Sequence, residues 1–171
     1  MAFAKDGVDL DILLAFALQW SHPDHPPVRV DHSELHAAEV SLNVTFPEDY
    51  KAEVLTTGLP WPTLALISGI LDRGADLHDI SELYLPQQIV DISTGWHEVG
   101  MPKTLVAIGS DGGGNQFCFD RRDLHQTAVL SAPVYYWDHE FGTVEQVSTS
   151  FPGWIGSYIG EWSRGLSYRD F

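Results

Sequence analysis

The strongest constraint in the sequence is a glycine-rich loop between two short apolar runs. The runs Leu105–Ile108 and Phe117–Phe119 are rich in Val, Ile and Phe, which favour the pleated surface of a strand. Between them stand Asp111, three consecutive glycines and Asn115. Glycine and Asn tolerate the positive φ angles that a hairpin loop requires. The segment 104–120 therefore predicts a β-hairpin.

Helices are expected before this hairpin. Val8–Trp20 is apolar almost all round, so the predicted first helix must be covered by other elements. Residues 21–28 contain three prolines and form a linker, because proline cannot continue a helix. A short helix is predicted at 32–41. Another begins at Pro47, since proline suits the first helical position, and it ends at Gly58.

Strands dominate the predictions for the middle of the chain. Thr63–Ile70 is continuously apolar and is predicted as a strand, although an apolar run of this kind also fits a helix. A helix begins at Pro86, where Ile89, Ile92 and Trp96 recur at helical spacing. Four further strands are predicted at 103–109, 115–120, 133–138 and 143–148.

A long helix is expected near the end of the sequence. Ser150 is a good N-cap, and the helix that it begins extends to Trp162. Six apolar side chains fall on one face of it: Phe151, Trp154, Ile155, Tyr158, Ile159 and Trp162. An aromatic face at this spacing is typical of a core. Helices, then hairpins, then a helix favour an α+β fold over alternating βαβ units, in one domain spanning 1–171.

The charge balance restricts the partners that the chain can bind. The sequence has 9 Lys plus Arg and 24 Asp plus Glu, so its formal charge is 9 − 24 = −15. Nucleic acids and anionic membranes need Lys and Arg to contact their phosphates, so neither is an expected partner. A basic protein is favoured, because opposite charges speed association. The alternative is an acidic surface that serves solubility alone.

Two features of the sequence favour a cytoplasmic protein. Cys118 is the only cysteine, which excludes an internal disulfide and fits a reducing compartment. Its apolar strand predicts a buried and inert thiol. Ile12–Trp20 is too short to cross a bilayer. The aspartates at positions 6, 9 and 11 have the wrong charge for a secretory signal.

Motifs for catalysis and metal binding are incomplete. The glycine loop lacks the Lys and Ser/Thr of a P-loop and the Gly and Glu positions of a calcium loop. His32 and His36 share a helical face near Glu39, but neither a His-Glu-x-x-His pattern nor a Cys ligand accompanies them. No Gly-x-Ser-x-Gly is present. We expect no catalytic residue, metal or cofactor; the alternative is a metal- or small-molecule-binding enzyme that uses the histidines and the Asp111 loop.

Acidic and aromatic side chains supply the candidate partner contacts. The carboxylates are Asp72, Asp76, Asp79 and Glu82, which cluster near the start of a predicted short helix, and Asp111, Asp138 and Glu140 in predicted turns. They form either a solvated edge or a patch that receives a basic surface. Trp61 lies between two prolines, which excludes it from a regular helix or central strand. It either fills the core or anchors an interface.

Four segments resemble, in the expected order, the SUKH superfamily and specifically its Smi/Knr branch. They are Glu39–Lys51 with Phe-Pro-Glu-Asp-Tyr, the hairpin motif Ile-Gly-Ser-Asp-Gly-Gly-Gly-Asn at 108–115, Pro133–Glu140 with Pro-Val-x-x-x-Asp-His-Glu, and Ser148–Ile155 with Ser-x-Ser-Phe. The resemblance spans roughly residues 32–162, and an ordered set of motifs is more specific than any one of them. It departs between Gly58 and Trp96, where the usual Asn-Gly-Gly is Thr57-Gly58-Leu59.

The resemblance implies a fold and a class of function. It implies one twisted, mainly antiparallel sheet with helices packed against it. Bacterial members act as immunity proteins that neutralise a toxin, often a nuclease, whereas fungal members are regulatory hubs in cell-wall synthesis. We expect a non-enzymatic immunity protein with a basic toxin domain as its partner and an acidic face that occludes it; the alternative is a regulatory scaffold protein of Smi/Knr type in cell-wall synthesis. A monomer and a homodimer both remain open.

Overall fold

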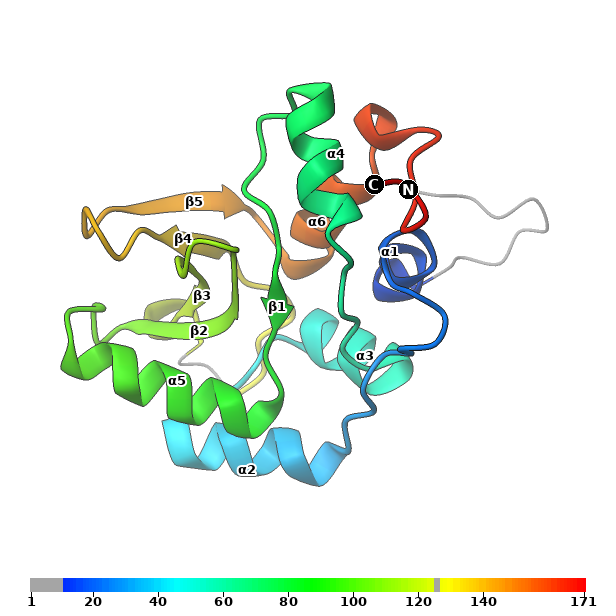
Figure 1. Cartoon of the computed structure of the whole chain (residues 1–171). Coiled ribbons are helices and arrows are strands. Elements are labelled where there is room, and N and C mark those ends of the chain that lie inside the picture. Colours follow the sequence, from blue (N-terminus) through cyan, green and yellow to red (C-terminus); the bar gives the residue numbers. More distant parts are fainter. Residues whose placement is uncertain (1–10, 125–126) are drawn as a thin grey trace.

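The computed structural model describes residues 11–124 and 127–171, and the fold below refers to these ranges (Figure 1). The start of the predicted first helix, 8–10, lies outside them. The helices are α1 (Ile12–Trp20), α2 (His32–Leu42), α3 (Glu48–Thr57), α4 (Ala65–Arg73), α5 (Pro86–Glu98) and α6 (Phe151–Gly156). The strands are β1 (Glu82–Leu83), β2 (Leu105–Ser110), β3 (Gln116–Asp120), β4 (Val134–Trp137) and β5 (Val144–Ser148). Three short 3₁₀ turns lie at Arg121–Asp123, Ser157–Ile159 and Glu161–Ser163.

The five strands form one open sheet in the order β1-β2-β3-β4-β5, and every neighbouring pair is antiparallel. The predicted hairpin is its centre, where β2 and β3 pair from Leu105 opposite Asp120 to Ser110 opposite Gln116. A bulge between Ala107 and Gly109 shifts the register within this pair. The α+β prediction and the predicted antiparallel sheet are confirmed.

Helices cover both faces of the central strands, which explains why β2 and β3 are apolar in continuous runs. On one face, Phe119 packs against Tyr50 of α3 with ring centroids 5.4 Å apart, and Phe117 packs against Trp154 of α6 at 4.6 Å. On the other face, Trp96 of α5 packs against Trp137 of β4 with ring centroids 5.2 Å apart. Figure 1 shows α5 beneath β2, with α2 below it.

The predicted need to cover the first helix is met by the C-terminal segment. Trp20 of α1 is fully buried, stacks on Trp162 and donates its indole N–H to the Tyr158 carbonyl at 2.9 Å. The Gln19 side chain donates to the carbonyls of Ser163 and Leu166. The two ends of the described chain are therefore fixed to each other.

The prediction of a strand at 63–70 is wrong, because this segment forms α4. Its buried residues, Ala65, Leu66, Gly69 and Ile70, recur at helical spacing. Gly69 permits close packing, since a Cβ there would lie 3.0 Å from Leu166 Cδ1 and 3.5 Å from the Trp20 ring. A continuous apolar run does not distinguish a strand from a helix. Here the helix is favoured by its packing against Leu166 and Trp20.

Two further expectations need correction. The final helix is shorter than predicted, because α6 ends at Gly156 and two 3₁₀ turns continue the chain to Ser163. Its predicted core face is nevertheless confirmed from Phe151 to Tyr158, while Ile159 and Trp162 are half-buried against the core. The short helix predicted beside the acidic cluster is absent: the described residues 74–81 connect α4 to β1 without a regular element.

Removing the Trp154 side chain should destabilise the protein strongly. Trp154 is 2% exposed and contacts the rings of Phe117, Phe151 and Tyr158. The variant Trp154→Ala should lower the free energy of unfolding by about 3–5 kcal/mol through the cavity it leaves, as measured by urea denaturation. The control Leu130→Ala, at a side chain 77% exposed, should change it by no more than about 0.5 kcal/mol. Equal midpoints for Trp154→Ala and wild type would contradict the packing described here.

Candidate partner-binding site

Three segments far apart in the sequence meet beside the tip of the central hairpin. The α4–β1 connection joins the hairpin loop where the Gly112 amide donates to the Asp79 carboxylate at 2.9 Å. The β4–β5 turn joins it where the His139 amide donates to the Asn115 side chain at 3.1 Å. We call the carboxylates on and next to the α4–β1 connection and the β4–β5 turn the acidic edge: Asp72, Asp76, Asp79, Glu82, Asp138, Glu140 and Glu145.

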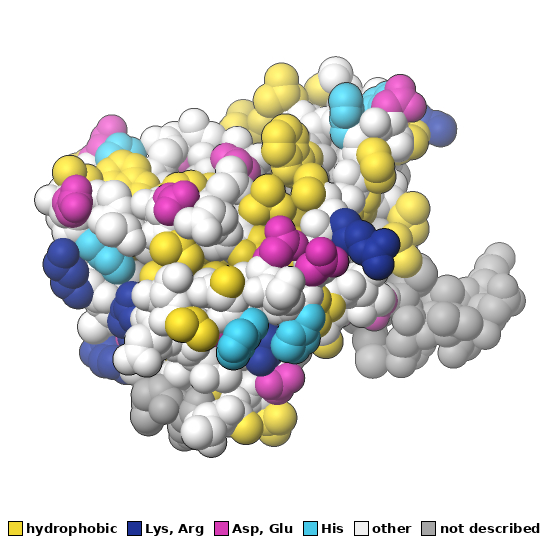
Figure 2. All heavy atoms as spheres, turned by 90° about the horizontal axis from the view of Figure 1, so that it is seen from below, with side chains coloured by type: hydrophobic (Ala, Val, Ile, Leu, Met, Phe, Trp, Pro, Cys, Tyr) yellow, Lys and Arg dark blue, Asp and Glu magenta, His cyan; other side chains and the backbone are white. Residues whose placement is uncertain are grey.

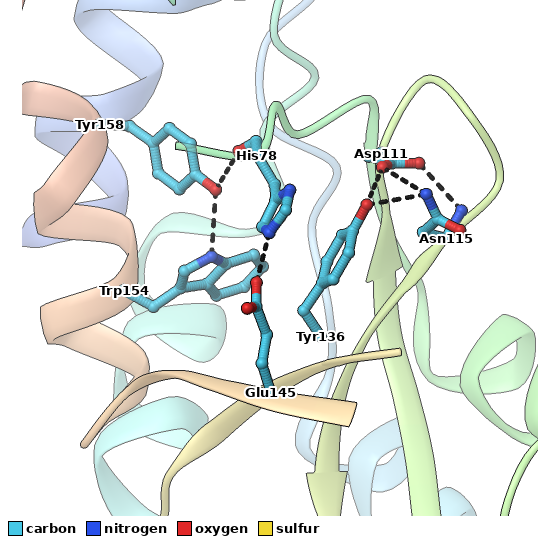
Figure 3. Close-up of polar contacts among 7 residues, drawn as sticks. All are labelled: His78, Asp111, Asn115, Tyr136, Glu145, Trp154 and Tyr158. Carbon is cyan, nitrogen blue, oxygen red and sulfur yellow. Dashed lines mark hydrogen bonds and ion pairs between the residues drawn. The ribbon is translucent and has the colours of Figure 1, made fainter. Parts of the chain in front are cut away.

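Asp111 holds the hairpin loop from within (Figure 3). Its Oδ1 accepts hydrogen bonds from the amides of Gly113 and Asn115, both at 2.9 Å. Its Oδ2 accepts from the Asn115 side chain at 3.0 Å and from the Tyr136 hydroxyl at 2.6 Å. Gly114 contributes a φ of +89°, which favours glycine. Because Asp111 is only 8% exposed and uses both oxygens internally, it supports the loop and presents little surface to a partner.

Tyr136 connects the loop to the α4–β1 connection. Burial raises the pKa of its phenol, and the Asp111 carboxylate raises it further, so Tyr136 stays a neutral hydrogen-bond donor. His78 stacks on its ring with centroids 3.6 Å apart and the planes 4° from parallel. The His78 imidazole also lies 2.5 Å from a carboxylate oxygen of Glu145 on β5 (Figure 3).

Helix α6 fixes the same connection from the other side. The Tyr158 hydroxyl donates to the His78 carbonyl at 2.6 Å, and the Trp154 indole donates to the Tyr158 hydroxyl at 3.2 Å (Figure 3). Both aromatic side chains are buried. Burial also raises the pKa of Asp79, with the charge of Asp111 as a further cause and the Gly112 hydrogen bond acting against it. The segment carrying Asp79 is therefore held at several points.

The predicted contact residues that do not belong to the hairpin tip lie in different environments. Asp72, Asp76 and Glu140 are exposed. Glu82 is half-buried and accepts a hydrogen bond from Gln88. Asp138 accepts from two amides of its own turn, those of residues 140 and 141, at 2.9 and 3.0 Å. Trp61 precedes α4 and is 57% exposed, so it does not fill the core.

Positive charge is scarce around the acidic edge. The sequence contains no Lys or Arg between Arg73 and Lys103, or between Arg122 and Arg164. Arg73 itself turns toward the C-terminal segment, where its guanidinium donates to the carbonyls of Trp162 and Arg164 at 3.0 and 3.3 Å. The side of α2 and α5 differs, because Lys and Arg side chains lie among Asp, Glu and His there (Figure 2).

Three residues of this region were missed by the sequence analysis: His78, Tyr136 and Glu145. None lies in a motif that marks it, and His78 and Glu145 are 67 positions apart. The sequence does mark Asn115, in the glycine loop, and Trp154 and Tyr158, on the predicted core face. The signal for their polar contacts is absent from local sequence, because it depends on the pairing of β4 with β3 and β5.

The described part of the chain gives little support for metal binding, for a reactive thiol or for a membrane-spanning helix. Within residues 11–124 and 127–171, no three His, Cys, Asp or Glu side chains are grouped to hold a metal ion. His32 and His36 line an open surface depression on α2 together with Glu39. Burial raises the pKa of the Cys118 thiol, which makes it a poor nucleophile. No helix in these ranges is both long and apolar enough to cross a membrane.

Comparison with protein families finds one family whose model matches most of the chain. Residues 29–157 match the model of the SMI1/KNR4 family (SUKH-1). The chain belongs to this family. The resemblance inferred from the four motifs is thus confirmed. Members of the SMI1/KNR4 family are often immunity proteins and are generally non-catalytic.

Solved structures agree on the fold. A protein from Pseudomonas syringae pv. tomato, known from its crystal structure, superimposes with a TM-score of 0.51 at 16% sequence identity. The match covers 93% of this chain and 98% of that chain. At this identity the likeness concerns the fold alone. A search of curated proteins finds no match.

Removing the Asp111 carboxylate should loosen the hairpin loop. In Asp111→Ala, the amides of Gly113 and Asn115 and the buried hydroxyl of Tyr136 lose their acceptor, which should lower the free energy of unfolding by about 1–3 kcal/mol. Amide exchange at Gly113 and Asn115 should accelerate in NMR measurements. The exposed control Asp72→Ala should change stability by no more than about 0.5 kcal/mol. Unchanged stability and unchanged exchange in Asp111→Ala would show that the loop does not depend on this carboxylate.

Proposed function

We propose that this protein is an immunity protein that binds a basic toxin domain through the acidic edge and neutralises it without catalysis. Its membership of the SMI1/KNR4 family supports the class of function. The observation that carries the proposal is the distribution of charge. Seven carboxylates lie on or next to the two segments that hydrogen-bond to the hairpin loop, and the sequence has no Lys or Arg between positions 73 and 103 or between 122 and 164.

The charges of the acidic edge would favour fast and selective association with a basic protein. Like-charged groups on one face produce a field that attracts a basic protein and raises the association rate. This field is screened over about 8 Å at physiological ionic strength. Exposed charges such as Asp72, Asp76 and Glu140 act mainly on the rate of encounter, because charges at the rim of an interface remain partly hydrated.

Neutralisation would follow from occlusion. A toxin that cleaves nucleic acid must present Lys and Arg to the phosphates of its substrate. The acidic edge offers carboxylates to the same side chains and would thereby cover the cleft or a surface beside it. The hydrogen bonds that fix Asp79 and the hairpin loop reduce the flexibility that binding would otherwise remove, and preorganisation of this kind raises affinity. We assign Asp111 to this supporting role and the exposed carboxylates to contact.

Reversing charge on the acidic edge should slow association with the cognate toxin domain, to be sought among the products of neighbouring genes. We expect the triple variant Asp72→Lys/Asp76→Lys/Glu140→Lys to associate at least about tenfold more slowly at low salt, with a dissociation rate changed much less. Surface plasmon resonance with a catalytically inactive toxin separates the two rates. The matched control Asp24→Lys/Asp91→Lys/Glu98→Lys has the same net charge at exposed positions elsewhere and should slow association less.

Growth protection provides the functional readout. Co-expression of the wild-type protein should protect cells from the active toxin, and the acidic-edge variant should protect them less than the control does. If the toxin does not bind the wild-type protein, the immunity assignment fails. If both triple variants bind alike, the acidic edge is not the contact surface.

A further inference from the structure

Helix α4 has an apolar outer face in addition to its buried face. Leu64 at its N-cap is 80% exposed and Leu71 is 75% exposed. Ile67 lies between them and is half-buried. Because these residues follow at intervals of three and four, they form one stripe along the side of α4 that faces away from the core. We call Leu64, Ile67 and Leu71 the α4 stripe.

The stripe is unusual for a surface helix. Singly scattered exposed apolar residues are normal in proteins, whereas a contiguous apolar patch indicates an interaction site. A surface helix ordinarily places charged and polar side chains on its outer side. On α4, polar side chains flank the stripe, with Ser68 and Asp72 on the helix itself. Water therefore contacts the apolar face of α4, and covering that face would be favourable.

The stripe adjoins the acidic edge. A Cβ on Gly112 would lie 4.0 Å from Ile67 Cδ1 and 3.3 Å from the Asp79 carboxylate, so Ile67 sits beside both the hairpin loop and Asp79. Asp72 follows Leu71 directly, and the α4–β1 connection continues the acidic edge from there. Figure 1 shows α4 at the top of the molecule, on the side away from α2 and α5.

We infer that the α4 stripe is the apolar centre of the partner interface and that the acidic edge is its charged rim. The occupant is a protein surface with exposed apolar side chains bordered by Lys and Arg. This inference rests on the proposed function, and it specifies the partner's chemistry. Charge complementarity selects such a partner over a second copy, because two copies meeting at this face would oppose carboxylates across the stripe.

The two parts of this surface should act on different steps. Rim charges govern encounter, whereas apolar side chains that become fully desolvated at the centre govern how long the complex survives. The variant Leu64→Gln/Leu71→Gln removes the apolar groups without adding charge. The control Leu130→Gln/Val99→Gln makes the same kind of change at side chains that are 77% and 71% exposed and lie outside the stripe.

Binding kinetics with the inactive toxin test the inference. The stripe variant should dissociate at least about tenfold faster, with its association rate within about twofold of wild type. The control should change either rate by less than about twofold. A stripe variant that dissociates like wild type, while wild type still binds the toxin, overturns the stripe and leaves the immunity assignment intact.

A second probe keeps the inference testable when the toxin does not bind. An amphipathic helical peptide of Leu and Lys should perturb NMR signals of Leu64, Ile67 and Leu71 in the wild-type protein, and its Leu/Glu counterpart should not. Loss of this perturbation in the stripe variant, but not in the control, supports the inference. Peptide binding that is indifferent to the stripe overturns it. A wild-type dimer that the stripe variant dissociates, detected by light scattering, also overturns it, because a second copy would then cover α4.

Discussion

Asp111 carries a carboxylate into a site that is 8% exposed, where two backbone amides, one side-chain amide and one phenol donate to it. A buried carboxylate is costly unless its oxygens accept hydrogen bonds, and these four donors meet that requirement. They come from the hairpin loop and from β4, so the carboxylate joins the tip of the hairpin to the next strand. In the loop held this way, the Gly112 amide donates a hydrogen bond to the Asp79 carboxylate, and the Asn115 side chain accepts one from the His139 amide. The position of the acidic edge depends on this chain of contacts.

In this arrangement, the side chains that hold the segments together differ from those that are exposed to a partner. Side chains that hold the segments together are buried or hydrogen-bonded internally, as Asp111, Tyr136 and Tyr158 are. The exposed carboxylates and the α4 stripe remain available outside this frame.

The sequence was sufficient to predict those elements that depend only on residues close to one another in the chain. The hairpin, the helices begun by Pro47 and Pro86 and the aromatic face of α6 follow from turn residues, proline placement and periodicity. The strand predicted at 63–70 was wrong because a continuous apolar run has no decisive period, and the helix is selected by packing against Trp20 and Leu166. Strand β1 has only two residues, which is too short to leave a pattern.

Of the candidate site, the sequence predicted the charged residues but not the contacts that hold them in place. Asp72, Asp76 and Glu140 follow from composition and turn positions, whereas the contacts of the α4–β1 connection and the β4–β5 turn with the hairpin loop arise only in the folded sheet. His78 stacks on Tyr136 and contacts Glu145 only in the folded sheet, so no local sequence pattern predicts these contacts. The α4 stripe required the helix itself, since the same residues in a strand would not share one face.

A footprint of the complex tests the central claim most directly. Hydrogen–deuterium exchange should be compared between the free protein and its complex with the cognate toxin domain. We predict slower exchange in the complex along α4, at 72–79 and in the β4–β5 turn, with little change on α2. Protection concentrated on α2 and α5, with α4 and the acidic edge exchanging as in the free protein, would contradict the account.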